Sequence, residues 1–236
     1  MNFALGLTLM MVGLLLSGSS VYGVTFCKTP GDRNCFTGKF ELVDIPGDPQ
    51  NKLLGADFGY VDPAGVGWQT NKGAETDGAS IPTLLRPFIG GPWEDAYIRA
   101  AVIHDWYCVR TVRPWADTHR VFYDAMLASG LNSAKAKLMF YAVYAFGPYW
   151  GYTEPGTKCS GTSNCIQTNG KDAVFVKISG QFSDVKNQDE LKAVEAAIEL
   201  SEATGGFSVD QLISIADKVH PKQHLLNHAP STGVTK

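Results

Sequence analysis

Residues that could do acid–base or metal chemistry are concentrated between positions 100 and 126, in AAVIHDWYCVRTVRPWADTHRVFYDAM. His104 is followed directly by Asp105, and Asp117 comes later in the same stretch. A neutral imidazole accepts a proton near neutral pH, and a carboxylate on its other nitrogen fixes its tautomer. We therefore expect any acid–base or metal chemistry of this protein to involve this stretch, with His104 and Asp117 as candidate catalytic residues.

Two predicted helices must position these groups. Apolar residues recur at intervals of three and four over residues 93–108, which predicts a helix with His104 on its inward stripe. A second helix is predicted over residues 114–129 because proline suits its first turn and a glycine follows it. On that helix Asp117 shares a side with Val121, so we expect its carboxylate to face inward. A buried carboxylate needs a cation, a metal or hydrogen-bond donors.

Structural alternatives stay open for these residues. His104 is alternatively a core histidine whose hydrogen bonds are satisfied, and Cys108 a small buried hydrophobe. His119 is expected to be a surface residue. Asp117 alternatively ties the two helices together through an ion pair with an arginine, the candidates being Arg99, Arg110 and Arg113.

Two further candidates lie outside this stretch. Asp77 stands in the Asp-Gly pair of a loop rich in Pro and Gly, so it is either a turn residue or a metal ligand. Three histidines of the C-terminal region recur every four residues and form a second candidate metal site: His220, His224 and His228.

Composition indicates one core domain and argues against nucleic acid as a partner. The chain has 236 residues, 44% of them hydrophobic, which suffices for one well-buried domain with an appendage. Its net charge is −3, whereas nucleic-acid binding usually needs a strongly basic face. No pattern in the sequence specifies the oligomeric state.

The N-terminal sequence predicts export. MNFALGLTLMMVGLLLSGSSVYG is an apolar run followed by small and polar residues, the order of a secretory signal cleaved after Gly23. Because a positively charged start is missing, an uncleaved anchor is the alternative. We expect a secreted or periplasmic protein, in a compartment where disulfides form. Two pairs of cysteines are close enough in sequence to close small loops: Cys27 with Cys35, and Cys159 with Cys165.

The pattern of elements predicts an α+β fold, in which a small antiparallel β-meander packs on a three-helix core. Within the meander, a turn at residues 62–65 should make a hairpin. A strand at residues 173–179 and a C-terminal helical pair should follow the core. The predicted organisation is a signal peptide (1–23), a Cys-bounded N-terminal segment (24–35), a core domain (36–152), a Cys-bounded loop (153–170), an extension with a strand and the helical pair (171–222), and a disordered tail (223–236).

Three ordered motifs carry a resemblance to a known family. TDGASIP at residues 76–82, AAVIHDWY at 100–107 and WADTHRVFYDAM at 115–126 resemble a bacterial and phage family known as domain of unknown function thirteen-fifty-three. The resemblance covers roughly half of the chain, from about residue 36 to residue 147. That family implies no activity.

The adjacent His-Asp on one helix, followed by Ala-Asp on the next, is also similar to the catalytic helices of phospholipases A2. That resemblance implies a general base at His104, an orienting carboxylate at Asp117 and a calcium ligand at Asp105. Calcium prefers several oxygen ligands, so loop carbonyls at Gly90 and Gly91 would have to join it, in the segment Phe88-Ile89-Gly90-Gly91.

The leading hypothesis is therefore a secreted hydrolase acting on a lipid or cell-envelope substrate. His104 would activate water, and Asp105, with or without Asp77, would hold a divalent cation, calcium first. The alternative is a non-catalytic envelope or phage-related binding protein whose His-Asp and Ala-Asp motifs form a structural polar network. A third hypothesis, metal-assisted cleavage of cell-wall material, uses the same residues and predicts zinc.

Overall fold

The computed structural model describes residues 23–78, 90–91, 93–159, 165–170, 172–182 and 185–229. Residues 1–22 of the predicted signal peptide, residues 79–82 of the first motif, residues 88–89 of the candidate calcium loop and residues 230–236 of the tail lie outside the described residues. The described helices are α2 (Asp95–Arg110), α3 (Trp115–Ala128), α4 (Ser133–Phe146), α5 (Val185–Glu202) and α6 (Val209–Val219). The described strands are β1 (Cys35–Gly38), β2 (Leu42–Ile45), β3 (Asp48–Leu54), β4 (Phe58–Val61), β5 (Gly67–Thr70), β6 (Glu75–Thr76), β7 (Tyr149–Tyr152) and β8 (Phe175–Ile178).

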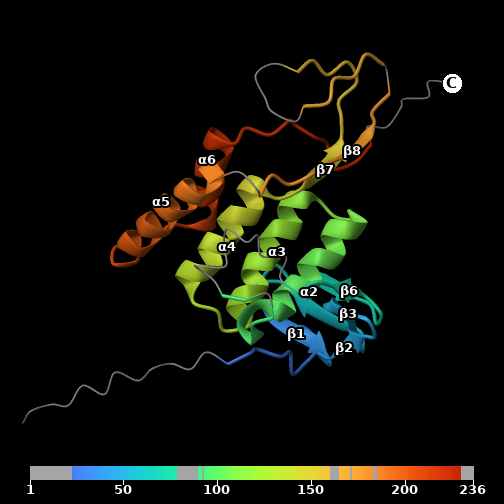
Figure 1. The fold of residues 1–236 in the computed structure, drawn as a ribbon, viewed down its shortest axis with the longest axis vertical. Coiled ribbons are helices and arrows are strands. Elements are labelled where there is room, and N and C mark those ends of the chain that lie inside the picture. The colour runs from blue at the N-terminus through green and yellow to red at the C-terminus, as the bar shows by residue number, and fades with distance from the viewer. Residues whose placement is uncertain are drawn as a thin grey trace, which may run out of the picture.

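The three predicted core helices form the centre of the molecule (Figure 1). Helix α3 packs between α2 and α4, and α4 also contacts α5 and α6 on its other side. Small residues such as Ala100, Ala125 and Ala142 are completely buried, which lets the helices approach closely. Helix α4 begins where predicted, because the Asn132 side chain accepts hydrogen bonds from two backbone N–H groups of its first turn.

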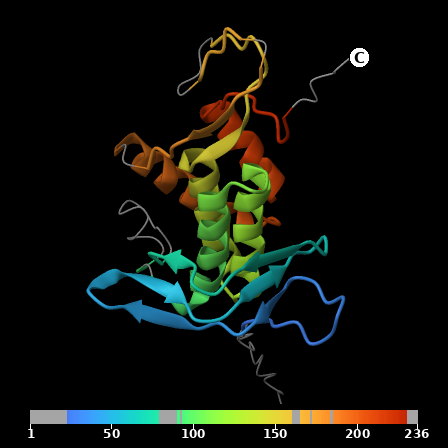
Figure 2. The same cartoon turned by 90° about the vertical axis from the view of Figure 1, so that its right-hand side faces the viewer.

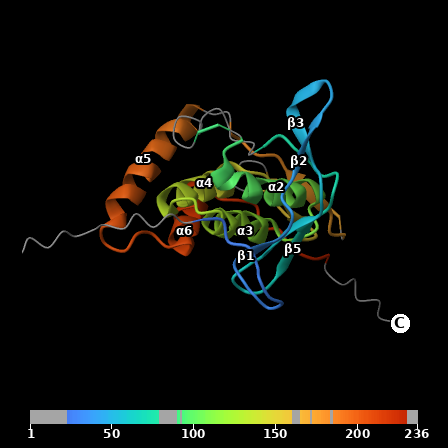
Figure 3. The same cartoon turned by 90° about the horizontal axis from the view of Figure 1, so that it is seen from below.

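The α+β class is confirmed, but the strands divide into three small antiparallel sheets and do not form one meander. One sheet has the order β1-β4-β5 and another the order β2-β3-β6, and both lie at one end of the helices (Figure 2). The chain leaves the first sheet at Gly38, where φ is +78° and an added Cβ would lie 2.4 Å from the Asp57 carbonyl oxygen. The following β2–β3 hairpin consequently projects away from the helices (Figure 3).

The predicted hairpin is confirmed as β4–β5, with register pairs that include Tyr60 opposite Trp68. Its turn is fixed by Asp62, whose side chain accepts a hydrogen bond from the backbone N–H of Val66 at 2.8 Å. Asp62 also accepts one from the Trp68 indole N–H at 3.0 Å. The Trp68 ring consequently packs edge-on against Tyr107 of α2, with 4.8 Å between the ring centres.

The predicted strand at residues 173–179 is present as β8, and it pairs with β7 in a separate two-stranded sheet. The C-terminal helical pair is α5 and α6, and the predicted capping box at the start of α6 is formed by Ser208 and Gln211. The disorder predicted from residue 223 is wrong for the first residues of that segment. The Gln223 side-chain amide exchanges hydrogen bonds with the backbone of Ile166, and Leu226 pairs with Tyr152.

Both predicted cysteine pairs form disulfides, Cys27 with Cys35 and Cys159 with Cys165, while Cys108 is a free thiol. None of the helices in the described part of the chain combines the length and the apolar character needed to cross a bilayer.

Candidate metal centre

Helices α2 and α3 bring two histidines and the free cysteine together inside the molecule. His104 and Cys108 are one turn apart on α2, and His119 faces them from α3. One ligand atom of each residue lies within 4.8 Å of those of the other two. The shortest separations are 2.9 Å between His104 Nε2 and His119 Nδ1, and 3.4 Å between Cys108 Sγ and His104 Nε2. We call these three residues the His–Cys–His cluster.

The second nitrogen of His119 fixes which of its atoms faces the cluster. Nε2 of His119 lies 2.9 Å from the carbonyl oxygen of Pro148. A carbonyl only accepts hydrogen bonds, so Nε2 carries the proton and Nδ1 presents its lone pair to His104. Metal-ligating histidines are usually held in this way, by a carbonyl or carboxylate on the nitrogen that does not bind the metal.

The second nitrogen of His104 has no described hydrogen bond, but a carboxyl group lies near it. An oxygen of the Asp105 carboxyl group lies 3.6 Å from Nδ1 of His104. The other oxygen accepts a hydrogen bond from the Thr76 hydroxyl on β6 at 3.1 Å, which connects the cluster to the sheet. Because Nδ1 of His119 is an acceptor, Nε2 of His104 carries the proton and donates it in the 2.9 Å contact. A cation that binds both nitrogens would displace that proton, and His104 would then carry its proton on Nδ1, toward Asp105. Asp105 is thus placed to orient His104.

Burial keeps both imidazoles neutral. The His104 side chain is 11% exposed and stacks on Phe122 with a centroid distance of 4.7 Å, and His119 has no exposed surface. Burial lowers the pKa of His104 to about 4. The pKa of His119 is also well below its usual value, because of burial first and the neighbouring His104 second. A neutral imidazole is the form that binds a metal.

The cysteine and the aspartate of the site are both shifted toward their neutral forms. Burial and the charge of Asp105 raise the pKa of the Cys108 thiol, while Lys177 opposes that shift. Burial, with the nearby charge of Asp77, raises the pKa of Asp105 well above its usual range. A thiol that binds a metal loses its proton to do so, and a bound cation would therefore lower the raised pKa of Cys108.

The structure does not place Asp117 in this cluster, and the prediction that Asp117 faces inward is wrong. Asp117 is exposed, and neither a hydrogen bond nor an ion pair links it to another described residue. Two residues correspond to about 200° around a helix, so His119 on the inner side requires Asp117 on the outer side. The predicted ion pair of Asp117 with an arginine is absent as well. The orientation of His104 is provided by its partners Asp105 and His119.

The two glycines predicted to help bind calcium lie near the start of α2. Glu94 accepts a hydrogen bond from the backbone N–H of Gly91, and the Tyr97 hydroxyl donates to the Gly91 carbonyl. His104 is seven residues beyond Tyr97, or about 10 Å along the helix axis. The structure therefore does not bring the Gly91 carbonyl to His104, whereas Asp77 is close enough to act on Asp105.

His119 was predicted to be a surface residue, and it is fully buried. One signal in the sequence could have indicated this: His119 shares the inner stripe of α3 with Phe122 and Met126, at intervals of three and four residues. The spacing of His104 and Cys108 was a second signal, because residues four apart lie on one helical face. Among the described residues the C-terminal histidines form no such group: His220 contacts Glu190 and His224 lies near Glu154.

These features define a class of protein: an α+β domain with two disulfides and a buried His–Cys–His cluster between two packed helices. The family model described as "Protein of unknown function (DUF1353)" matches residues 53–143, a range that contains the whole cluster. The chain is 60% identical to "Uncharacterized protein y4iH" of Sinorhizobium fredii over 234 residues, which cover 99% of this chain and 98% of that protein. The chain therefore belongs to one family with that protein, and the matching family model describes this family as one of unknown function.

A second relative matches only part of the chain. "Uncharacterized protein y4jT" of Sinorhizobium fredii is 46% identical over 107 residues, which cover 45% of this chain and 32% of that protein. No solved structure matches the chain.

Proposed function

We propose that this protein is a metal-dependent hydrolase that acts outside the cytoplasm, with zinc held by His104, Cys108 and His119. The observation that carries the proposal is the convergence of two imidazole nitrogens and one thiol sulfur within 4.8 Å. Nitrogen and sulfur are the ligand atoms that zinc prefers, and catalytic zinc sites typically have three protein ligands and one open position. Zinc in such a site lowers the pKa of a bound water and polarises a carbonyl.

The residues of the chain have separate roles in this proposal. His119 is held by Pro148, and His104 by Asp105, so the two imidazole rings are oriented before any cation binds. Asp105 is partly exposed, unlike His119, and lies on the side of α2 that faces β6. Asp105 is therefore also the group available to take a proton from a water molecule at the site.

Zinc replaces calcium as the first choice because of the donor atoms. Calcium takes six to eight oxygen ligands, and the cluster offers none. A calcium site on Asp77 and Asp105 is the competing arrangement, and it would leave the His–Cys–His cluster empty of metal. The phospholipase-like version of the proposal depends on that arrangement, whereas cleavage of cell-wall material agrees better with zinc.

Metal binding is the first test. The full chain is stripped with a chelator, and zinc bound per chain is measured after dialysis against zinc. Cobalt is then substituted, because a thiolate ligand gives cobalt a charge-transfer band in the near ultraviolet. One metal per chain with that band supports the site, and a folded, reduced protein that binds neither metal overturns it.

Hydrolysis is the second test. The zinc-loaded protein is incubated with phospholipid vesicles carrying a hydrolysable ester and, separately, with peptidoglycan, and His104→Ala serves as the inactive variant. Release of product that is lost both in His104→Ala and after chelation supports a hydrolase. Product formation that is equal in the variant and the parent protein contradicts it.

A non-catalytic role for the cluster is the second candidate, and one observation favours it. Both nitrogens of the fully buried His119 have partners at 2.9 Å, as expected of a polar contact that joins α3 to α2 and to the start of β7. His119→Gln separates the candidates, because the glutamine amide retains a donor for Pro148. Loss of stability without any metal binding in the parent protein would identify the cluster as structural and the protein as a binding module.

A further inference from the structure

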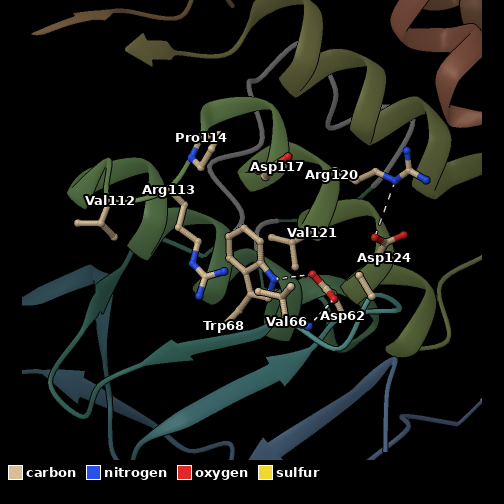
Figure 4. A pocket seen from close by; sticks show the side chains of 11 residues that line it. Asp62, Val66, Trp68, Val112, Arg113, Pro114, Asp117, Arg120, Val121 and Asp124 are labelled. Carbon is tan, nitrogen blue, oxygen red and sulfur yellow. Dashed lines mark hydrogen bonds and ion pairs between the residues drawn. The ribbon is translucent and has the colours of Figure 1, made fainter. Parts of the chain in front are cut away.

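A second site lies on the outer face of α3, on the opposite side of that helix from His119. It is a pocket of about 500 Å³ between the β4–β5 turn, the segment that joins α2 to α3, and α3 itself (Figure 4). Cavities of this size are typical of small-molecule sites. The proposed zinc site makes no use of this pocket, and a ligand could bind in the pocket whether or not zinc is bound.

The pocket has a fixed cation on one side. The Arg113 guanidinium lies 4.4 Å from the centre of the Trp68 ring and 5.4 Å from that of Tyr107. One of its nitrogens donates to the carbonyl oxygen of Gly67 at 2.7 Å. A guanidinium has five N–H donors, so donors remain for a carboxylate in the pocket, and the stacking has already restricted the side chain.

Two carboxylates lie on the opposite side, along α3. Asp117 and Asp124 are seven residues apart, or two helical turns, and both line the pocket. Asp117 is exposed and forms no hydrogen bond or ion pair with any described residue. The Asp124 side chain is only 15% exposed, yet its one described partner is Arg120, with 3.8 Å between charged atoms. No described group donates a hydrogen bond to either carboxylate.

The position of Asp124 is the observation that calls for a ligand. A mostly buried carboxylate normally receives hydrogen bonds, and leaving it without donors is costly. Arg120 does not satisfy Asp124 with a hydrogen bond, because its nearest nitrogen lies 3.8 Å from the carboxylate oxygen. Burial raises the pKa of Asp124 to about 6. An ammonium group in the pocket would supply the missing donors.

Apolar surface separates the cation from the carboxylates. Figure 4 shows Trp68, Val66 and Val121 between Arg113 on one side and Asp124 on the other. Two more charged residues line the pocket: Asp62, whose carboxylate already accepts hydrogen bonds from Val66 and Trp68, and Arg120 beside Asp124. The carboxylates that accept no hydrogen bond from a described residue are those of Asp117 and Asp124, along α3. We infer that the pocket binds a small zwitterion, such as a short peptide, with its carboxylate on Arg113 and its ammonium group on the acidic side formed by Asp117 and Asp124.

Calorimetric titration of the full chain with four compounds tests this inference. Dialanine carries both charges, N-acetyl-dialanine lacks the ammonium group, dialanine amide lacks the carboxylate, and free alanine carries both charges at a shorter separation. We expect saturable binding of a zwitterion and binding weakened at least tenfold when either charge is removed. A preference for dialanine over alanine identifies a peptide as the ligand, and the reverse preference a free amino acid.

Asp117→Asn is the matched variant, because Asp117 is exposed and unpaired and its replacement should not disturb the fold. Glu199→Gln, an exposed position on α5, is the control with the same change of charge. Asp117→Asn should weaken dialanine binding at least tenfold, and Glu199→Gln should leave it unchanged. Three results overturn the inference: no saturable binding at millimolar concentration, equal binding of the charged and blocked compounds, or equal loss in the two variants.

Discussion

Nδ1 of His119 lies 2.9 Å from Nε2 of His104, and this contact joins two helices at a position where His119 is fully buried and His104 nearly so. The Pro148 carbonyl on the far nitrogen of His119 determines that its lone pair points inward. Cys108 adds a sulfur 3.4 Å from the same His104 nitrogen. The relationship between the two imidazoles therefore gathers two nitrogens and one sulfur at one point between α2 and α3.

Cys108→Ser should separate metal binding from folding. Serine is close to cysteine in size, and Cys108 is only partly buried at the edge of the cluster, so the metal-free variant should melt near the parent protein. A hydroxyl is not deprotonated as a thiol is, so zinc affinity should fall by at least about tenfold. Competition with a chromophoric chelator measures that affinity. Unchanged affinity, with the cobalt charge-transfer band retained, would remove Cys108 from the ligand set.

Thermal melting with different cations should distinguish zinc from calcium. A cation that binds only the folded state, present at about 100 times its Kd, stabilises that state by about 2.7 kcal/mol. We expect zinc to raise the Tm of the chelator-treated protein and calcium to leave it unchanged. Asp105→Asn should lower the zinc affinity by about tenfold, because in the proposed site Asp105 orients His104 from 3.6 Å and is not itself a zinc ligand. A calcium-dependent rise that Asp105→Asn abolishes would instead place calcium on Asp77 and Asp105.

Asp124→Asn should change how stability depends on pH. Burial, opposed by Arg120 and aided by Asp62, raises the pKa of Asp124 from 3.8 to about 6. Between these values the folded protein holds a proton that the unfolded chain has released, so stability falls as pH rises through the interval. The shift corresponds to a loss of up to about 3 kcal/mol in the free energy of unfolding. Asparagine does not titrate, so the Asp124→Asn variant should not show this loss.

Urea unfolding of the parent protein and Asp124→Asn at several pH values between about 4 and 7 measures that difference. The variant should gain stability relative to the parent protein as pH rises. Asp189→Asn, at an exposed position on α5 away from Asp124, is the control and should show no such gain. Parallel pH profiles for all three proteins would contradict the prediction.

Replacing Cys27 and Cys35 together with alanine should destabilise the protein by about 2–3 kcal/mol. The disulfide closes a short loop and restricts the unfolded chain, and Cys35 begins β1 next to the buried Phe36. Chemical denaturation of the variant under oxidising conditions, compared with the parent protein before and after reduction, gives the cost. Reduction also opens Cys159–Cys165, so it should cost the parent protein at least as much stability as the variant loses. A parent protein insensitive to reduction would show that the Cys27–Cys35 disulfide contributes little.

The sequence alone determined the local elements, because their signals lie within a few residues of one another. Periodic apolar positions predicted α2 and α3, Asn132 and Ser208 marked helix starts, and the spacing of Cys27 and Cys35 indicated a disulfide. These features depend on backbone geometry and short-range hydrogen bonds. They do not depend on how distant parts of the chain pack together.

Only the tertiary structure decided which face of α3 meets α2. Buried residues occupy much of the circumference of α3, so its sequence leaves the rotation of the helix about its axis undetermined. Asp117, Val121 and Asp124 do share one side of α3, as the sequence predicted. That side of the helix lines a pocket and does not face His104. Packing against α2 and α4 fixes the rotation, and that rotation brings His119 to His104 and leaves Asp117 outside.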